Sequence, residues 1–127
     1  MVKLDHLRIA VKDWRASRDW YCQHLGLRLE FELANGGDAR LGVAAMQDDA
    51  GLTLFLDQVN HEVHNCTCVL YYQVDSVDAL YSKLAASRVV FRRAPEKQYW
   101  GYGAELADPD GHIVRIWDET SMHAHET

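Results

Sequence analysis

The chain has 127 residues, 48% of them hydrophobic, so it is long and apolar enough to bury one sizeable core. Its formal net charge is −6 and its basic residues are scattered, which makes nucleic acid and anionic membranes poor candidates for partners. No apolar run is long enough to cross a bilayer and the N-terminal residues do not form a signal peptide, so we expect a cytoplasmic protein.

The first half predicts a strand, a helix and three further strands. Over residues 4–11, apolar side chains at the odd positions alternate with His6 and Arg8, as in a half-buried strand. Asp13 and Gly26 are typical of the two ends of a helix. The other elements expected in this half are a helix over residues 14–25 and strands over residues 28–33, 39–46 and 52–56.

After a polar linker over residues 59–65, the second half predicts the same order. Asp75 is expected to cap a helix whose apolar residues recur at helical spacing. "APEK", at residues 94–97, is expected to be a loop, and "DPDG", at residues 108–111, a turn. The elements are strands over residues 69–74, 89–92, 101–107 and 113–117, and a helix over residues 76–87.

The two halves therefore repeat one βαβββ unit, which indicates a duplicated supersecondary structure. We expect an α+β fold in one domain, residues 1–127, with modules over about 3–58 and 66–119. The two modules would form a cupped mixed sheet with the helices on its outer face. The strand residues that face away from the helices would then line a concavity.

Two stretches in this arrangement resemble a known family. "LDHLRIAVKDWRASRDWYCQHLGLRLEF" and "ADPDGHIVRIWDE" are similar to the opening strand and helix, and to the last turn and strand, of the vicinal oxygen chelate superfamily. That superfamily includes glyoxalase I, extradiol dioxygenases and bleomycin-resistance proteins. The resemblance covers residues 3–119, and it implies a small-molecule site in the cup.

The resemblance also implies four metal-ligand positions, of which His6 fills the first. The second falls at or near Leu54, the third near Val69, and the fourth, usually a glutamate, at Arg115. Leucine and valine donate no electron pair, and arginine keeps its positive charge. We therefore expect no metal and no other cofactor. A divalent metal held by His6 within an atypical ligand set is the alternative.

In place of a metal, the expected cup offers charged and aromatic side chains. An arginine fork beside aromatic rings suits a small organic anion. The ligand-binding residues predicted for the cup are His6, Arg8, Tyr71, Gln73, Trp100, Tyr102, Arg115 and Trp117.

Each of these residues also has a structural interpretation. Arg115 needs a negative partner, which is either a ligand anion or a carboxylate such as Glu30, Glu32 or Glu105. We favour the ligand. His6 is either a hydrogen-bonded cavity residue or, if the protein is an enzyme, its acid–base group. Trp100 and its neighbours could equally belong to the core or to a dimer interface.

Three functions follow from these alternatives. The first is a metal-independent domain that binds a small organic molecule, similar to the bleomycin-resistance branch. The second is a lyase, isomerase or dioxygenase of the same superfamily, with an atypical metal site or with His6 as acid–base. The third is an interaction module. In each case we expect a homodimer, because the chain carries four tryptophans and six tyrosines that a small core does not wholly bury.

Overall fold

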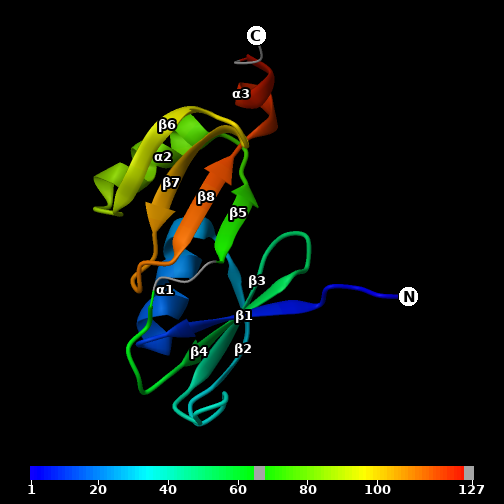
Figure 1. Ribbon diagram of the computed structural model, residues 1–127, viewed down its shortest axis with the longest axis vertical. Coiled ribbons are helices and arrows are strands. Elements are labelled where there is room, and N and C mark those ends of the chain that lie inside the picture. Colours follow the sequence, from blue (N-terminus) through cyan, green and yellow to red (C-terminus); the bar gives the residue numbers. More distant parts are fainter. Residues whose placement is uncertain (65–67, 125–127) are drawn as a thin grey trace. The chain divides into compact units, whose positions relative to one another are not determined.

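A computed structural model describes residues 1–64 and 68–124 of the chain, so Asn65, the last residue of the expected linker, lies outside the described residues. The chain divides into two compact units, Met1–His64 and Asn65–Thr127 (Figure 1). The first unit contains β1 (His6–Val11), α1 (Trp14–Leu25), β2 (Arg28–Leu33), β3 (Val43–Gln47) and β4 (Thr53–Gln58). The second contains β5 (Val69–Gln73), α2 (Val77–Ala86), β6 (Phe91–Gln98), β7 (Gly101–Ala107), β8 (Ile113–Trp117) and α3 (Glu119–Ala124).

Each unit forms one four-stranded mixed sheet with the same topology. The strand orders are β1-β4-β3-β2 and β5-β8-β7-β6. β1 runs parallel to β4 and β5 runs parallel to β8, whereas the remaining neighbours are antiparallel. The expected α+β fold of two βαβββ modules is confirmed.

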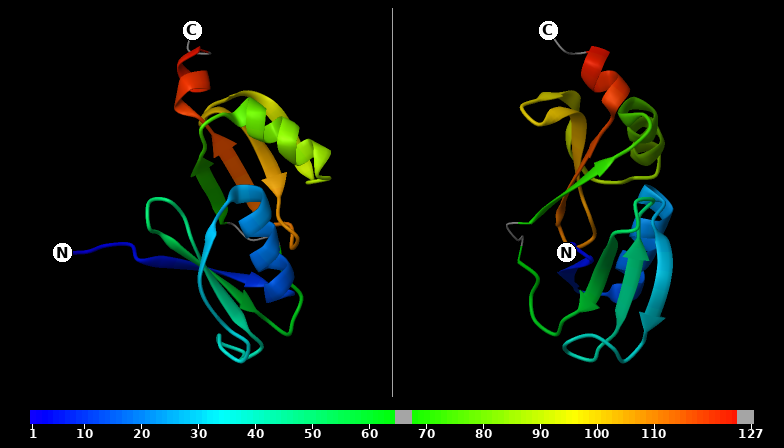
Figure 2. Two further views of the ribbon diagram at one scale, coloured as in Figure 1. Left: turned by 180° about the vertical axis from the view of Figure 1, so that it is seen from behind. Right: turned by 90° about the vertical axis from the view of Figure 1, so that its right-hand side faces the viewer.

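One helix covers one face of each sheet (Figure 2): α1 packs on β3 and β4, and α2 packs on β6 and β7. We call the opposite face of each sheet its open face. The buried apolar side chains of each unit lie between sheet and helix, because period-two alternation sends every second strand residue to the helix. No helix in the described part of the chain has the length and apolar character needed to span a membrane.

Local sequence determines α1. The Asp13 side chain accepts hydrogen bonds from the amides of Arg15 and Ala16, and Gly26 ends the helix with a left-handed φ of 69°. Both caps were predicted. Trp14, Ser17 and Tyr21 recur at helical spacing and are buried against the sheet.

The start of α2 differs from the prediction. Ser76, not Asp75, is the N-cap, and its hydroxyl accepts a hydrogen bond from the Ala79 amide. The first amide of the helix, that of Val77, donates to the Asp118 carboxylate at 2.6 Å. Asp118 also accepts from the Ser121 amide in the first turn of α3. One buried carboxylate therefore serves the N-termini of two helices.

Three segments were assigned wrongly from the sequence. β3 begins at Val43 rather than at residue 39, because Arg40 and Gly42 have φ angles of 58° and 123° that a strand does not contain. β6 continues to Gln98 through the predicted "APEK" loop, since Pro95 is tolerated on an edge strand. The helix α3 was not predicted.

Candidate functional site

The side-chain direction in β8 is as the sequence predicted. Val114 and Ile116 are buried on the helix side, whereas Ile113, Arg115 and Trp117 are half-buried on the open face. The register places Arg115 directly between Tyr71 on β5 and Glu105 on β7. A row of polar side chains thus crosses three neighbouring strands of the second sheet, β5, β8 and β7.

Arg115 is held by protein groups. Its Nε donates to Glu105 Oε1 at 2.9 Å, and its Nη1 donates to the Tyr71 hydroxyl. The side chain of Glu105 is 8% exposed and that of Arg115 is 19% exposed. Burial lowers the pKa of Arg115, but hydrogen bonds to Glu105, Tyr99 and Tyr71 outweigh it and raise the pKa above its ordinary value. The partner of Arg115 is thus a protein carboxylate, which is the alternative that the sequence analysis did not favour.

Two aromatic rings flank this guanidinium. The Arg115 Cζ lies 5.3 Å from the ring centroids of both Tyr71 and Trp100, which is within cation–π range. The two rings meet edge to face at 5.5 Å. Trp100 reaches this place because Gly103 has no side chain, since a Cβ there would lie 2.7 Å from the indole. Arg115, Tyr71 and Trp100 therefore form one cluster, as predicted, with Gly103 as an unpredicted support.

Tyr102, which was predicted to bind the ligand, is not part of this cluster. Its side chain is buried on the helix face of β7, where the hydroxyl donates to Asp78 Oδ1 of α2 at 2.6 Å. That hydrogen bond, with burial and the charges of Asp78 and Asp118, raises the pKa of Tyr102 to about 12. The role of Tyr102 is to join sheet and helix.

The other predicted residues of the second unit lie at the end of the same face. Gln73 and Trp117 are paired in the register of β5 and β8, with Gln73 exposed and Trp117 half-buried. Their position is compatible with ligand contact.

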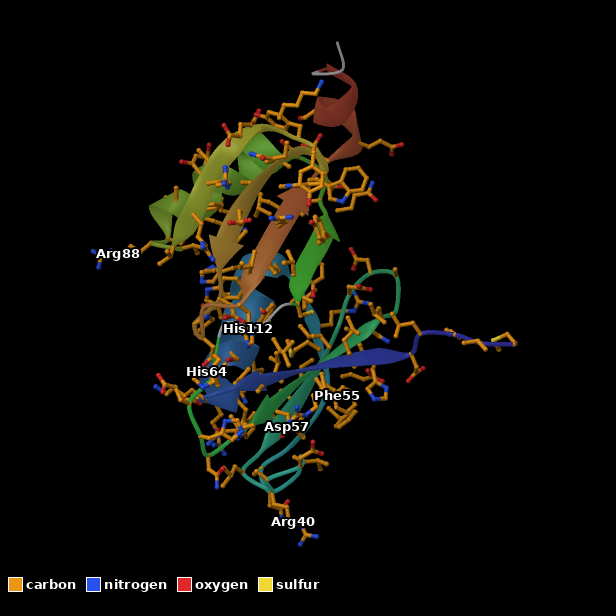
Figure 3. The ribbon with its side chains drawn as sticks, viewed as in Figure 1. Arg40, Phe55, Asp57, His64, Arg88 and His112 are labelled. Carbon is orange, nitrogen blue, oxygen red and sulfur yellow. The ribbon has the colours of Figure 1, made fainter. Side chains whose placement is uncertain are left out.

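His6 and Arg8 lie on the open face of the first sheet. His6 stacks on Phe55 with ring centroids 4.6 Å apart, and its Nδ1 lies 3.1 Å from Asp5 Oδ2. Arg8 Nε donates to Asp57 Oδ2 at 2.7 Å and lies 3.3 Å from Asp38 Oδ2. The side chains of Phe55 and Asp57, both on β4, lie on this face as well (Figure 3). That His6 and Arg8 share a cavity with Arg115 stays a prediction.

The equal topology of the two units identifies equivalent positions. Leu7 pairs with Leu54 in the first unit, as Leu70 pairs with Val114 in the second, and Leu54, Leu70 and Val114 are buried against the helices. The open-face residue of β4 that corresponds to Arg115 is therefore Phe55. The second ligand position, expected at or near Leu54, therefore corresponds to Phe55, because Leu54 faces the helix and a one-residue shift moves a side chain to the other face.

The model of the Glyoxalase/Bleomycin resistance protein/Dioxygenase superfamily matches residues 3–116. The chain belongs to this superfamily. No curated protein gives a significant match.

Solved structures from several bacteria share the fold. A member from Sphaerobacter thermophilus superposes with a TM-score of 0.76 at 20% identity, covering 94% of this chain and 98% of that one. A protein from Agrobacterium tumefaciens gives a TM-score of 0.74 at 24% identity, covering 93% and 98%. A possible glyoxalase from Bacillus cereus gives 0.71 at 20% identity, covering 92% and 99%. At these identities the likeness establishes the fold alone.

The residues at the four ligand positions implied by the superfamily do not fit a divalent metal. They are His6, Phe55, Val69 and Arg115, and only the first can donate an electron pair. Arg115 is positively charged and forms an ion pair with Glu105. Among the described residues, no three histidine, cysteine, aspartate or glutamate side chains are grouped so that they could hold a metal ion.

Sequence reasoning missed one residue of the open face, Arg92 on β6. Its Nε lies 3.7 Å from Glu105 Oε2, so it extends the row formed by Tyr71, Arg115 and Glu105 onto the fourth strand. Alternation could not have identified it. Phe91 packs against Tyr81 of α2, but the register of β6 and β7 shifts after Phe91, and the residue paired with Glu105 is Arg93.

Proposed function

We propose that the chain binds a small organic anion with a planar body on the open face of its second sheet, without a metal at the superfamily's usual position. The observation that carries this proposal is the cluster around Arg115. Where the superfamily's metal-dependent members have a glutamate, this chain has an arginine fixed by Glu105 and flanked by Tyr71 and Trp100. Fixed positive charge beside aromatic surface is suited to such a ligand.

The charges on this face agree with an anionic ligand. Glu105 neutralises one of two arginines near it, Arg115 at 2.9 Å and Arg92 at 3.7 Å. One positive charge is left over at a half-exposed position. The open face of the first sheet differs, because Arg8 there is shared by two carboxylates, those of Asp57 and Asp38.

Thermal unfolding with a panel of small acids, each paired with its neutral amide, tests the proposal. A ligand that binds only the folded chain raises its Tm by mass action. We expect benzoate-like acids to raise the Tm in a saturable way, their amides to have little effect, and EDTA to leave the shift unchanged. If no acid raises the Tm, or if the shift requires added zinc, nickel, iron or manganese, the proposal is wrong and the enzyme alternative gains.

We also propose the homodimer expected from the sequence. Support comes from large apolar side chains that are exposed within each unit, including Phe31, Leu33 and Val90. Light scattering at micromolar concentration should give twice the chain mass, and a monomer mass would contradict it.

A further inference from the structure

Arg115 makes its side-chain hydrogen bonds inside the protein. Its Nε donates to Glu105, its Nη1 donates to Tyr71, and the side chain is only 19% exposed. A ligand carboxylate that bound Arg115 with two hydrogen bonds would have to displace Glu105, whose burial makes the loss of its partner costly, or Tyr71. Arg115 therefore organises the site but is poorly placed to bind the anion itself.

Arg92 is more exposed than Arg115 and makes fewer contacts inside the protein. Its side chain is 46% exposed, and its 3.7 Å separation from Glu105 Oε2 is an ion pair too long for a hydrogen bond. Across the described part of the chain, its guanidinium has no other ion pair and no hydrogen bond. Its fork thus remains available for the bidentate geometry in which arginine binds carboxylates.

The position of Arg92 limits the size of the ligand. The Trp100 indole lies over Gly103 of β7, whereas Arg92 of β6, the neighbouring strand, lies near Glu105, two residues further along β7. Adjacent strands are about 4.8 Å apart and two residues along a strand span about 7 Å, so one small conjugated molecule can place an acidic group on Arg92 and a ring against Trp100. The row contains two arginines and one glutamate, which leaves a charge that a single negative group balances.

We propose that Arg92 is the residue that binds the anion and that the ligand is a planar monocarboxylate, which rests on the proposed function of this face. Arg115 then acts through Glu105 and Trp100 as a positioning residue. A dianion is disfavoured because the buried Glu105 carboxylate lies beside the bound group.

Two neighbouring variants test this, Arg92→Gln and Arg93→Gln. Arg93 is a matched control: it is paired with Glu105 in the register of β6 and β7, but its Nη1 lies 3.7 Å from Glu96 and its side chain is 58% exposed, so both changes remove one charge and one long ion pair. Calorimetric titration with benzoate, trans-cinnamate, phthalate and inorganic phosphate provides the affinities. We expect Arg92→Gln to weaken monocarboxylate binding roughly ten- to hundredfold, Arg93→Gln to change it less than about twofold, and both variants to unfold like the wild type.

The outcomes separate the two proposals. If the acids bind the wild type and Arg92→Gln equally well, or if both variants lose affinity alike, the role of Arg92 is wrong while the proposed function stands. Tighter binding of phthalate or phosphate than of benzoate overturns the monocarboxylate class. If none of the four anions binds the wild type, the proposed function and this inference fail together.

Discussion

In each unit the last strand ends with a side chain that accepts a hydrogen bond from the first amide of the helix. Gln58 Oε1 accepts from the Trp14 amide at 3.1 Å, and Asp118 Oδ2 accepts from the Val77 amide at 2.6 Å. The two residues occupy equivalent places, since Gln58 is the last residue of β4 and Asp118 directly follows β8. The duplicated fold has thus kept the link from sheet to helix with two different residue types, since either an amide or a carboxylate oxygen satisfies a free helix amide.

The open faces show no such agreement. The equivalents of Arg115, Glu105 and Gly103 in the second sheet are, in the first sheet, Phe55, Ala45 and Val43. Strand residues on the helix side are thus constrained by packing and by hydrogen bonds to the helix backbone, whereas residues on the open face are free to differ between the units. Function is therefore to be sought where the two units differ.

The largest expected effect comes from Arg115→Met, which gives the second sheet an apolar residue where the first has Phe55. Glu105 would be left as a buried carboxylate with Arg92 as a distant partner. We expect the free energy of unfolding to fall by roughly 3–5 kcal/mol in urea titrations. Adding Glu105→Gln should recover much of the loss. A single mutant as stable as the wild type would show that the ion pair has no structural role.

A smaller effect is expected from Gly103→Ala, which moves the second sheet toward the Val43 of the first. The new Cβ would lie 2.0 Å from the Ile116 carbonyl oxygen and 2.7 Å from the Trp100 ring, so β7 must shift. We expect a loss of about 1–3 kcal/mol and a change in tryptophan fluorescence. Gly51→Ala is the control for fluorescence: its Cβ meets nothing within 4 Å, and its φ of 91° makes the substitution a test of backbone strain alone. A fluorescence change as large in Gly51→Ala as in Gly103→Ala would contradict the role given to Gly103.

The duplicated helix link can be compared directly with Gln58→Ala and Asp118→Ala. Each removes the acceptor of one helix amide, which costs about 1 kcal/mol. Asp118→Ala should cost about 2 kcal/mol, because the Ser121 amide loses its acceptor as well. Denaturant unfolding of the two variants measures the difference. A larger loss for Gln58→Ala would reverse the comparison.

The smallest effect at neutral pH is expected for Tyr102→Phe. The first sheet has Gly42 at the equivalent position, so only the second unit has this hydrogen bond from sheet to helix. Its loss should cost about 1 kcal/mol.

The same bond has a pH dependence that the variant should lack. The pKa of Tyr102 is about 12 in the folded chain and about 10 when unfolded. The stabilisation is fully present below pH 10 and is lost as the pH rises toward 12. Unfolding curves from pH 9 to 12 should converge for wild type and variant. Parallel curves would show that Tyr102 does not titrate in this way.

The fold was predictable because its signals are local. The Asp13 side chain and the left-handed backbone of Gly26 set the two ends of α1. The Asp-Pro-Asp-Gly turn likewise comes just before the last strand. The misassigned β6 shows the limit of this approach. Pro95 interrupts the pattern within the strand, and only the position of β6 at the sheet edge makes it acceptable.

The candidate site was only partly predictable, because it depends on register between strands far apart in sequence. Alternation placed Arg115 on the open face, but the choice of Glu105 as its partner required the pairing of β7 with β8. The face of Tyr102 was not predicted for the same reason. Once Glu105 is known to lie on the open face, alternation along β7 turns Tyr102 toward the helix. Arg92 was overlooked because the strand that carries it was expected to end there.

The strand order has a consequence for how the chain folds during synthesis. The first sheet is built only from His6–Gln58, and its parallel pair joins β1 to the last strand made, β4. The sheet therefore has to wait for Gln58, and it can then close while the ribosome is still producing the second half. Until that moment β1 has no partner strand, so its backbone amides and carbonyls stay unpaired.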